Sequence, residues 1–422
     1  MRTLLKKWER VGFSFKLEWL LRCVNTILTG EALFTALDKV STPEFQDGLK
    51  KAERAIDILL NLISARLGLD HDRVLGSRYS FPVMARYLMQ RGGHLTDYRE
   101  RDKLLYWYIH TIIWGRYAGS TETKINQDLH LIEGADGGLE RLITQLRQER
   151  GGLTIHADDF WGWSTGARFY PLLYLLTRVW HACDWGTGIE LSAHLLGKAS
   201  SLQLHHIFPK GLLYQHGYTR PDVNAIANFT FLTQETNLAI SNRPPEEYLP
   251  EIARKYPGAL ESHWIPTDAG LWKVESYPAF LDARRELLAK AANQFLESLL
   301  AGGIPESSAP APILEREVQV VPGGIFGEGE EQLLLETSIW VVGQGLPEGE
   351  HMYELLDPET EQPLAILDLA WPEGLQAGYS EPIALLLNEA KEALERASQA
   401  GFRCFTDVEA FRHYVQCEIL AL

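Results

Sequence analysis

The feature that most constrains how this chain can fold is an abrupt change in charge near residue 304. Residues 1–304 contain 35 Lys and Arg against 34 Asp and Glu, whereas residues 305–422 contain 5 against 22. The net charge of −16 therefore comes from the last part of the chain. A shift this sharp indicates a domain boundary. Residues 301–312, which are rich in Gly, Ser, Ala and Pro, are predicted to be the linker at that boundary.

The length of 422 residues suggests two or three domains. We expect them over residues 1–165, 166–300 and 313–422, and a hydrophobic content of 45% is ample for their cores. The first 304 residues are nearly neutral overall and can still form a basic groove. The acidic last part, in contrast, is a poor surface for a phosphate backbone.

Cysteine usage and hydropathy predict the compartment. The four cysteines lie far apart and form no CxxC pair, which argues against a zinc ribbon or a disulfide framework and fits a reducing cytoplasm. No secretory signal is recognised, and the most apolar stretch, residues 169–180, is too short to cross a bilayer. We therefore expect a cytoplasmic protein with no membrane partner.

Apolar residues recur at helical spacing through most of the first 300 residues, which predicts a mostly α-helical fold there. Thr42 is interpreted as the cap of one of these helices, with Pro43 at its first position. Beyond the linker the pattern predicts a separate α/β (or α+β) domain. Its predicted strands are Leu333–Val342, Leu364–Ala370 and Arg403–Phe405, and its predicted helix is Ile383–Ala400.

One segment in the middle of the chain carries residues suited to phosphodiester hydrolysis. That reaction needs a base for water, charge stabilisation on the phosphate and help for the leaving oxygen. A histidine suits the first task because its ordinary pKa is about 6.5, and a divalent metal suits the other two. His205 and His206 end an apolar strand that Pro209 stops. Asn228 follows His206 by 22 residues, and Asn237 follows Asn228 by 9.

The run HHIFPK…NFTFLTQETNLAISNRPPEEYL resembles the HNH (His-Me finger) nuclease domain of GmrSD-type, modification-dependent restriction enzymes. The resemblance is strong over residues 165–255, looser over residues 14–165 and absent beyond the linker. It implies a mostly α fold with a ββα-metal (HNH) nuclease core in residues 166–300 and a helical domain in residues 1–165. It also implies a DNA endonuclease that acts in defence against foreign, including modified, DNA.

The resemblance assigns a role to each residue of the pattern. His206 matches the general base that activates the attacking water. His205 and Asn237 match the two metal ligands, and Asn228 matches the structural asparagine that ties the loop in place and helps to orient the base. Adjacent residues on a regular strand point to opposite faces, so the two histidines can share a site only if the strand twists or ends there.

Two departures from the family pattern bear on the site. The residue before the base is often a carboxylate in the family but is His205 here. A neutral imidazole suits Mn²⁺, Ni²⁺ or Zn²⁺ better than Mg²⁺, so all four metals stay open. Ala227 replaces a glycine before the structural asparagine. Independently of the resemblance, we assign the nearby cations Lys210 and Arg243 to phosphate contacts.

Enzymes of this family usually begin with an NTP-hydrolysing domain bearing an Asp-Gly-Gln-Gln-Arg motif, which this sequence lacks. Either that activity resides on a separate polypeptide or the protein works without it. We favour a separate NTPase subunit, because the family is known in split form. The expected partners are therefore DNA and that subunit, and the sequence leaves the oligomeric state open.

Two other functions fit the same residues. A non-catalytic subunit that binds nucleic acid or assembles a complex keeps the fold without the chemistry. An RNA-cleaving toxin or nicking enzyme uses the same chemistry, which is indifferent to the sugar. In the acidic domain, Asp368, Glu389 and Lys391 faintly resemble a restriction-type nuclease core, but the last two fall on a helical pattern. That domain is better interpreted as a protein-binding or regulatory module.

Overall fold

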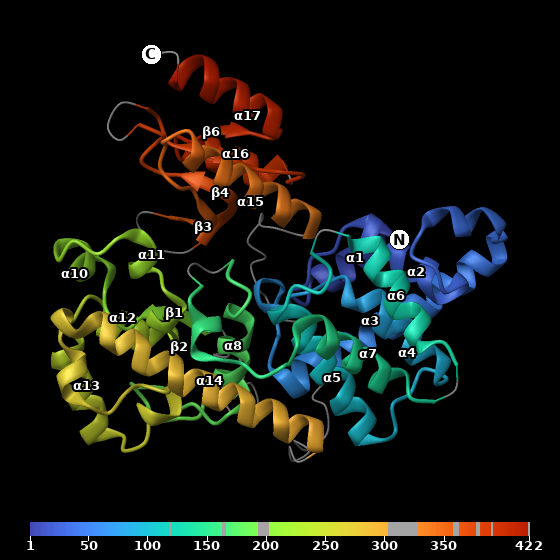
Figure 1. Cartoon of the computed structure of the whole chain (residues 1–422), viewed down its shortest axis with the longest axis horizontal. Coiled ribbons are helices and arrows are strands. Elements are labelled where there is room, and N and C mark those ends of the chain that lie inside the picture. Colours follow the sequence, from blue (N-terminus) through green and yellow to red (C-terminus); the bar gives the residue numbers. More distant parts are fainter. Residues whose placement is uncertain are drawn as a thin grey trace. The chain divides into compact units, whose positions relative to one another are not determined.

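The computed structural model describes residues 1–118, 120–134, 136–162, 166–192, 202–302, 328–357, 363–376, 380–389 and 391–420. These residues are mostly helical and include two small sheets (Figure 1). They form two compact units. Almost all described residues up to Gly302 belong to the first unit, and those from Glu328 onward belong to the second. The prediction of a mostly α-helical chain with a separate α/β region is confirmed.

The described parts of residues 1–165 and 166–300 lie almost wholly within the first unit, and the division between them stays a prediction. Within the described residues, no helix is both long and apolar enough to cross a membrane. The helices of the first 180 residues are α1 (Arg2–Glu9), α2 (Leu17–Thr29), α3 (Thr42–Leu67), α4 (Ser80–Gln90), α5 (Tyr98–Ile113), α6 (Thr121–Ile132), α7 (Gly138–Arg150) and α8 (Tyr170–Val179).

Helix α3 begins with a reciprocal cap. The Ser41 hydroxyl accepts a hydrogen bond from the Glu44 amide, and the Glu44 carboxylate accepts one from the Ser41 amide at 2.8 Å. The prediction that Thr42 is the cap is therefore wrong by one residue. The Ser-x-x-Glu spacing satisfies two helix-end amides at once, and this places Thr42 and Pro43 inside the first turn.

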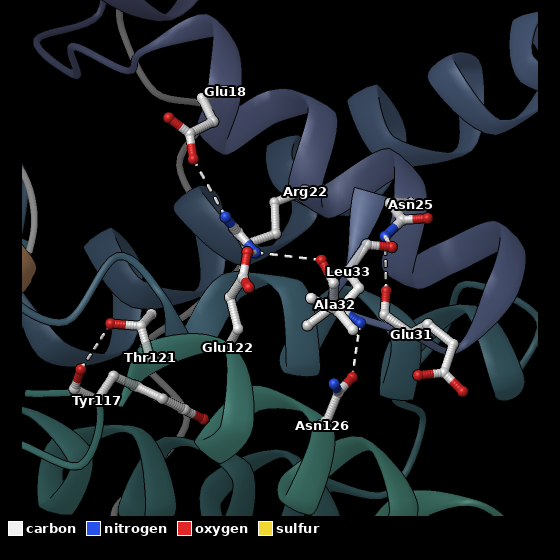
Figure 2. A network of polar contacts seen from close by, with 10 residues as sticks. All are labelled: Glu18, Arg22, Asn25, Glu31, Ala32, Leu33, Tyr117, Thr121, Glu122 and Asn126. Carbon is white, nitrogen blue, oxygen red and sulfur yellow. Dashed lines mark hydrogen bonds and ion pairs between the residues drawn. The ribbon is translucent and has the colours of Figure 1, made fainter. Parts of the chain in front are cut away.

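A buried arginine joins α2 to α6 (Figure 2). Arg22 donates hydrogen bonds to the carbonyl of Ala32 at 3.1 Å and to the carboxylates of Glu122 at 2.8 Å and Glu18 at 3.1 Å. The Asn126 side chain accepts from the Ala32 amide at 2.6 Å. Because these bonds fix the turn after α2 and one face of α6, we interpret the cluster as structural.

The second half of the first unit contains a two-stranded antiparallel sheet of β1 (Gln203–His206) and β2 (Phe229–Leu232). Short helices α10 (Lys210–Gln215) and α11 (Arg220–Val223) lie between the strands in sequence. The helices after β2 are α12 (Gln234–Ile240), α13 (Pro245–Lys255) and α14 (Tyr277–Ala301).

Helix α14 links this sheet to the earlier helices, since it contacts α5, α8 and the turn that leads into β2. The fully buried Arg284 donates hydrogen bonds to the carbonyls of Ala227 at 2.8 Å and Phe229 at 2.6 Å. An apolar core that includes Phe208, Leu232 and Leu249 supports the sheet and the helices after it. The sheet therefore rests on packed helices.

The second unit has a four-stranded sheet in the order β3-β4-β5-β6, antiparallel except between β5 and β6. The predicted strands at Leu364–Ala370 and Arg403–Phe405 are confirmed as parts of β4 and as β6. The elements are α15 (Glu328–Gly343), β3 (Glu350–Leu356), β4 (Pro363–Trp371), β5 (Ile383–Leu385), α16 (Lys391–Gln399), β6 (Arg403–Phe405) and α17 (Val408–Tyr414).

Two predictions in this unit are wrong. The segment Leu333–Val342 lies in helix α15, in which Leu334, Thr337 and Val341 are buried at helical spacing. Apolar residues on its exposed side, such as Ile339 at 63% exposure, made the run resemble a strand. The range Ile383–Ala400 is a strand followed by a helix, because its buried apolar start pairs with β4 on one side and β6 on the other.

Candidate active site

The two adjacent histidines occupy the last two positions of β1. His205 lies opposite Thr230 of β2, and His206 lies opposite Phe229. Since successive side chains of a strand alternate, the two imidazoles leave the strand on different faces. The two rings accordingly contact different side chains, Asn237 for His205 and Asn224 for His206. Helix α12 begins two residues after Leu232, which pairs with Gln203 at the start of β1, and this brings Asn237 beside Gln203 and His205.

His205 and Asn237 are in direct contact. Nδ1 of His205 lies 2.8 Å from Oδ1 of Asn237, and the amide nitrogen of Asn237 donates to Oε1 of Gln203 at 3.2 Å. Trp185 and Tyr248 enclose the His205 ring, which is 3% exposed, by edge-to-face contacts. Two side chains that are 32 positions apart in sequence therefore bring a ring nitrogen and an amide oxygen within hydrogen-bonding distance of each other.

The surroundings of His205 keep its ring neutral. Burial lowers the pKa of His205 to about 4, and the hydrogen bond with Asn237 opposes this shift only in part. Nε2 is buried and has no hydrogen-bond partner among the described residues. Because the Asn237 amide oxygen can only accept, Nδ1 of His205 carries the ring proton in this arrangement. Nδ1 can donate to Asn237 or, with the proton on Nε2, offer its lone pair to a metal ion.

His206 contacts a different asparagine. Its Nε2 lies 3.2 Å from Oδ1 of Asn224, and its ring packs edge-on against Phe229. With that amide oxygen as the acceptor, Nε2 carries the ring proton and Nδ1 keeps a lone pair. Burial, followed by the nearby charge of Lys210, lowers the pKa of His206 well below its ordinary value. The imidazole is therefore neutral at pH 7 and able to accept a proton.

Asn228 is fully buried and binds backbone groups only. Its side-chain oxygen accepts from the Phe208 amide at 2.8 Å, and its amide nitrogen donates to the carbonyls of Phe208 at 3.1 Å and Val223 at 3.0 Å. Its main-chain carbonyl accepts from the Ile207 amide at 2.9 Å. These bonds join the chain just after His206 to both ends of the turn before β2. The arrangement suits a positioning role.

The two residues predicted to contact phosphate, Lys210 and Arg243, differ in their surroundings. Lys210 is exposed at the start of α10, and its charge acts on His206. Arg243 is 40% exposed after α12 and pairs with Glu251 at 2.9 Å. No hydrogen bond within the described residues joins Arg243 to either histidine. The structure thus brings Lys210, but not Arg243, to the candidate base.

Two further residues of this region were not singled out in the sequence. Asn224 contacts the candidate base, but it stands among ordinary turn residues and carries no signal of its own. Asp184 is buried beneath α12. Its Asp-Trp-Gly-Thr-Gly context is typical of a turn in which an aspartate binds the following amides, so a search for such turns would have found it.

His205 and Asn237 offer two donor atoms that suit a divalent metal ion. Two donors are fewer than such an ion needs. A neutral imidazole and an amide oxygen suit Mn²⁺, Ni²⁺ or Zn²⁺, and Mg²⁺ less well. In the part of the chain that the structure describes, no three His, Cys, Asp or Glu side chains gather into a metal-binding group. Water and substrate oxygens would therefore have to complete the coordination, as in catalytic sites that keep open positions.

Two of the three residues that faintly suggested a second nuclease centre have contacts of their own. Asp368 is fully buried on β4 and accepts a hydrogen bond from the Leu387 amide at 2.6 Å. The Lys391 side chain is 89% exposed, begins α16 and pairs with Glu395 at 2.9 Å. These contacts give Asp368 a structural role at the end of β5 and leave Lys391 in solvent.

No family model matches the chain. A similar protein is the uncharacterized protein MJ0686 of Methanocaldococcus jannaschii, which is 26% identical over 161 residues. The match covers 37% of this chain and 26% of that protein. The chain therefore spans about a quarter of the length of this relative.

Proposed function

We propose that this chain is a metal-dependent HNH endonuclease that hydrolyses DNA phosphodiester bonds. The observation that carries the proposal is the contact that His205 on β1, next in sequence to His206, makes with Asn237 on α12. His205 Nδ1 and Asn237 Oδ1 lie 2.8 Å apart, and His206, the next residue, is neutral and held by Asn224. Strands β1 and β2 followed by helix α12, with α10 and α11 between the strands, support the proposal of a ββα-metal core.

The residues divide the work of hydrolysis between them. Nδ1 of His206 takes the proton of the attacking water, while Nε2 stays bound to Asn224 and holds the ring in place. His205 and Asn237 would hold the metal ion, which would supply charge neutralisation at the phosphate and help for the leaving oxygen. Asn228 fixes the chain beside the base, and Lys210 contacts a substrate phosphate.

The biological role that we propose is defence against foreign or modified DNA, together with a separate NTPase subunit. This part of the proposal is supported by the likeness of residues 165–255 to GmrSD-type enzymes. The near neutrality of residues 1–304 leaves room for a basic groove in the first unit, whereas the acidic second unit is better suited to a protein partner.

Plasmid cleavage by the purified full chain tests the activity. Reactions contain Mg²⁺, Mn²⁺, Ni²⁺ or Zn²⁺, with and without NTP, and use plain and modified DNA. We expect His206→Ala to lower the rate by about 10²-fold or more, the typical contribution of a general base. The control is His216→Ala, because His216 is exposed and its side chain bonds only to the Leu212 carbonyl among the described residues.

The outcomes separate the candidate functions. Cleavage that survives in His206→Ala would exclude this residue as the base. Cleavage of RNA in preference to DNA would favour a toxin with the same chemistry. Wild-type protein that binds DNA but cuts no substrate under any of these conditions would favour a non-catalytic subunit.

A further inference from the structure

Asp184 is a fully buried carboxylate in the turn between α8 and β1. Its Oδ2 atom accepts hydrogen bonds from the amides of Gly186 and Thr187, each at 3.1 Å, and from the Thr187 hydroxyl at 3.0 Å. These three bonds close the turn on itself. By themselves they describe an ordinary aspartate turn.

The same carboxylate also binds the start of α12. Oδ1 accepts from the amide and the hydroxyl of Thr233, both at 3.0 Å, and Oδ2 accepts from the Thr236 hydroxyl at 2.5 Å. Thr233 is the N-cap residue of α12, and Thr236 immediately precedes Asn237. Asp184 therefore holds the first turn of the helix that carries a candidate metal ligand.

The turn at Asp184 packs closely against the start of α12. A Cβ atom added at Gly186 would lie 2.3 Å from the Thr236 hydroxyl oxygen. On the other side, the Tyr256 hydroxyl donates to the Gly186 carbonyl at 2.6 Å. The spacing between the turn and the helix is thus fixed from both directions.

The next residue of the turn reaches the other candidate ligand. Trp185 is 2% exposed, and its ring packs edge-on against His205 with 5.9 Å between centroids. Trp185 also packs against His263, whose Nδ1 lies 2.5 Å from the hydroxyl of Thr230, the β2 residue opposite His205. One turn therefore contacts the surroundings of both donor residues.

Because Asp184 is charged, its carboxylate is the acceptor in every one of these hydrogen bonds. Burial would raise the pKa of Asp184, but the hydrogen bonds from Thr236, Thr233 and Thr187 outweigh it and hold the pKa below the ordinary aspartate value. The carboxylate is therefore ionised at neutral pH and only accepts. An asparagine in its place would turn an NH₂ group toward hydroxyl and amide donors.

We propose that Asp184 is a positioning residue of the metal site, which fixes α12 so that Asn237 stays against His205. The inference rests on the proposed nuclease function. Asp184 does not touch the metal itself; it acts through Thr233 and Thr236. Loss of such supporting partners typically costs 10–100-fold in metal affinity or activity.

Mn²⁺ binding to the full chain, measured by calorimetry and by electron paramagnetic resonance, tests the inference without the cleavage reaction. We expect Asp184→Asn to weaken Mn²⁺ binding by about 10- to 100-fold. Thr236→Val, which removes one hydroxyl from the carboxylate, is expected to weaken binding in the same direction. Thr236→Ser keeps that hydroxyl and is expected to bind Mn²⁺ like the wild type.

Asp128→Asn is the matched control, because Asp128 is a buried carboxylate on α6 that pairs with Arg116 at 2.7 Å. It is expected to lower the thermal unfolding midpoint and leave Mn²⁺ affinity unchanged. If Asp184→Asn and Thr236→Val lower only the unfolding midpoint, Asp184 is a structural cap and the inference is wrong. If Asp184→Asn does not fold, the Thr236 pair decides in the same way.

The failure of the proposed function gives a different result. If the wild type binds no Mn²⁺, or if His205→Ala and Asn237→Ala bind it as tightly as the wild type, the metal site itself is wrong. That outcome overturns both proposals. Tight binding that depends on His205 and Asn237 but not on Asp184 overturns the positioning role alone.

Discussion

At the scale of single residues, Asn228 is held in place beside the sheet by the hydrogen bonds of its side chain. The Asn228 amide forms three bonds to the backbone with no exposed surface. In a buried place, each group left without its partner costs about 1–3 kcal/mol, so an amide of this kind tolerates little substitution. Its contribution to catalysis is indirect, because its bonds go to the chain on either side of the base.

We predict that Asn228→Ala lowers the free energy of unfolding by about 2–4 kcal/mol, because it leaves the Phe208 amide and carbonyl unpaired. We also predict a fall in cleavage rate of about tenfold or more under conditions where the variant is still folded. Urea unfolding and plasmid cleavage measure the two effects.

Asn293 provides a matched control for this variant. Its side chain accepts from the Ile155 amide at 3.0 Å and donates to the carbonyls of Ile155 and Ala289 at 2.7 and 2.9 Å. Asn293→Ala should therefore destabilise the fold to a similar degree and leave the rate intact. Equal losses of rate in the two variants would mean that Asn228 contributes only stability.

At the scale of elements, helices whose apolar residues recur at helical spacing were predictable from sequence. Segments with an uninterrupted run of apolar residues were not. The long helices α3 and α14 follow from apolar spacing and from their proline-containing first turns. The run Leu333–Val342 failed because apolar residues lie on both sides of α15. Exposed positions such as Ile339 mask the helical period of the buried ones.

The candidate site was predictable in its residue types and spacings, but its contacts were not. Spacing along the chain gives no information on which asparagine meets which histidine. The sequence assigned roles to Asn228 and Asn237, while the partner of His206 proved to be Asn224. The link from Asp184 to α12 could not be seen in the sequence, because its partners Thr233 and Thr236 lie about fifty positions away.

A pair of substitutions in α15 tests its helical structure. On a strand, Ile339 and Val341 would share a face, but on this helix Ile339 is 63% exposed and Val341 is fully buried. We predict that Ile339→Glu changes the unfolding free energy by no more than about 0.5 kcal/mol, whereas Val341→Glu costs about 3 kcal/mol or more. Thermal unfolding followed by circular dichroism distinguishes them. Equal effects would favour a strand.

At the scale of the whole molecule, several histidines are buried and uncharged in the folded state. Burial lowers the pKa of His205 to about 4 and the pKa values of His110 and His263 to about 3. In the unfolded chain each histidine titrates at about 6.5. Between these values the unfolded state binds protons that the folded state does not, so acid favours unfolding.

We predict that the free energy of unfolding is largest above pH 6.5 and falls as the pH decreases toward 4. The slope that each of these histidines contributes is at most about 1.4 kcal/mol per pH unit. Urea unfolding at pH 7.5, 6 and 5 measures it. His263→Gln should reduce the slope. A stability that stays constant from pH 7.5 to 5 would contradict this account.

The short step from β2 to α12 has a consequence for recognising related genes. Asn228 and Asn237 are separated by one strand, a single capping residue and the first three residues of α12, so an insertion there would displace the second asparagine. The interval from His206 to Asn228 instead passes through α10, α11 and an exposed turn at Gly217, where extra residues meet no obstacle. Relatives that have diverged in length should therefore vary in the first interval and keep the second. A sequence pattern that allows a variable number of residues between His206 and Asn228, and a fixed number between Asn228 and Asn237, should find relatives whose overall sequence identity is too low to detect.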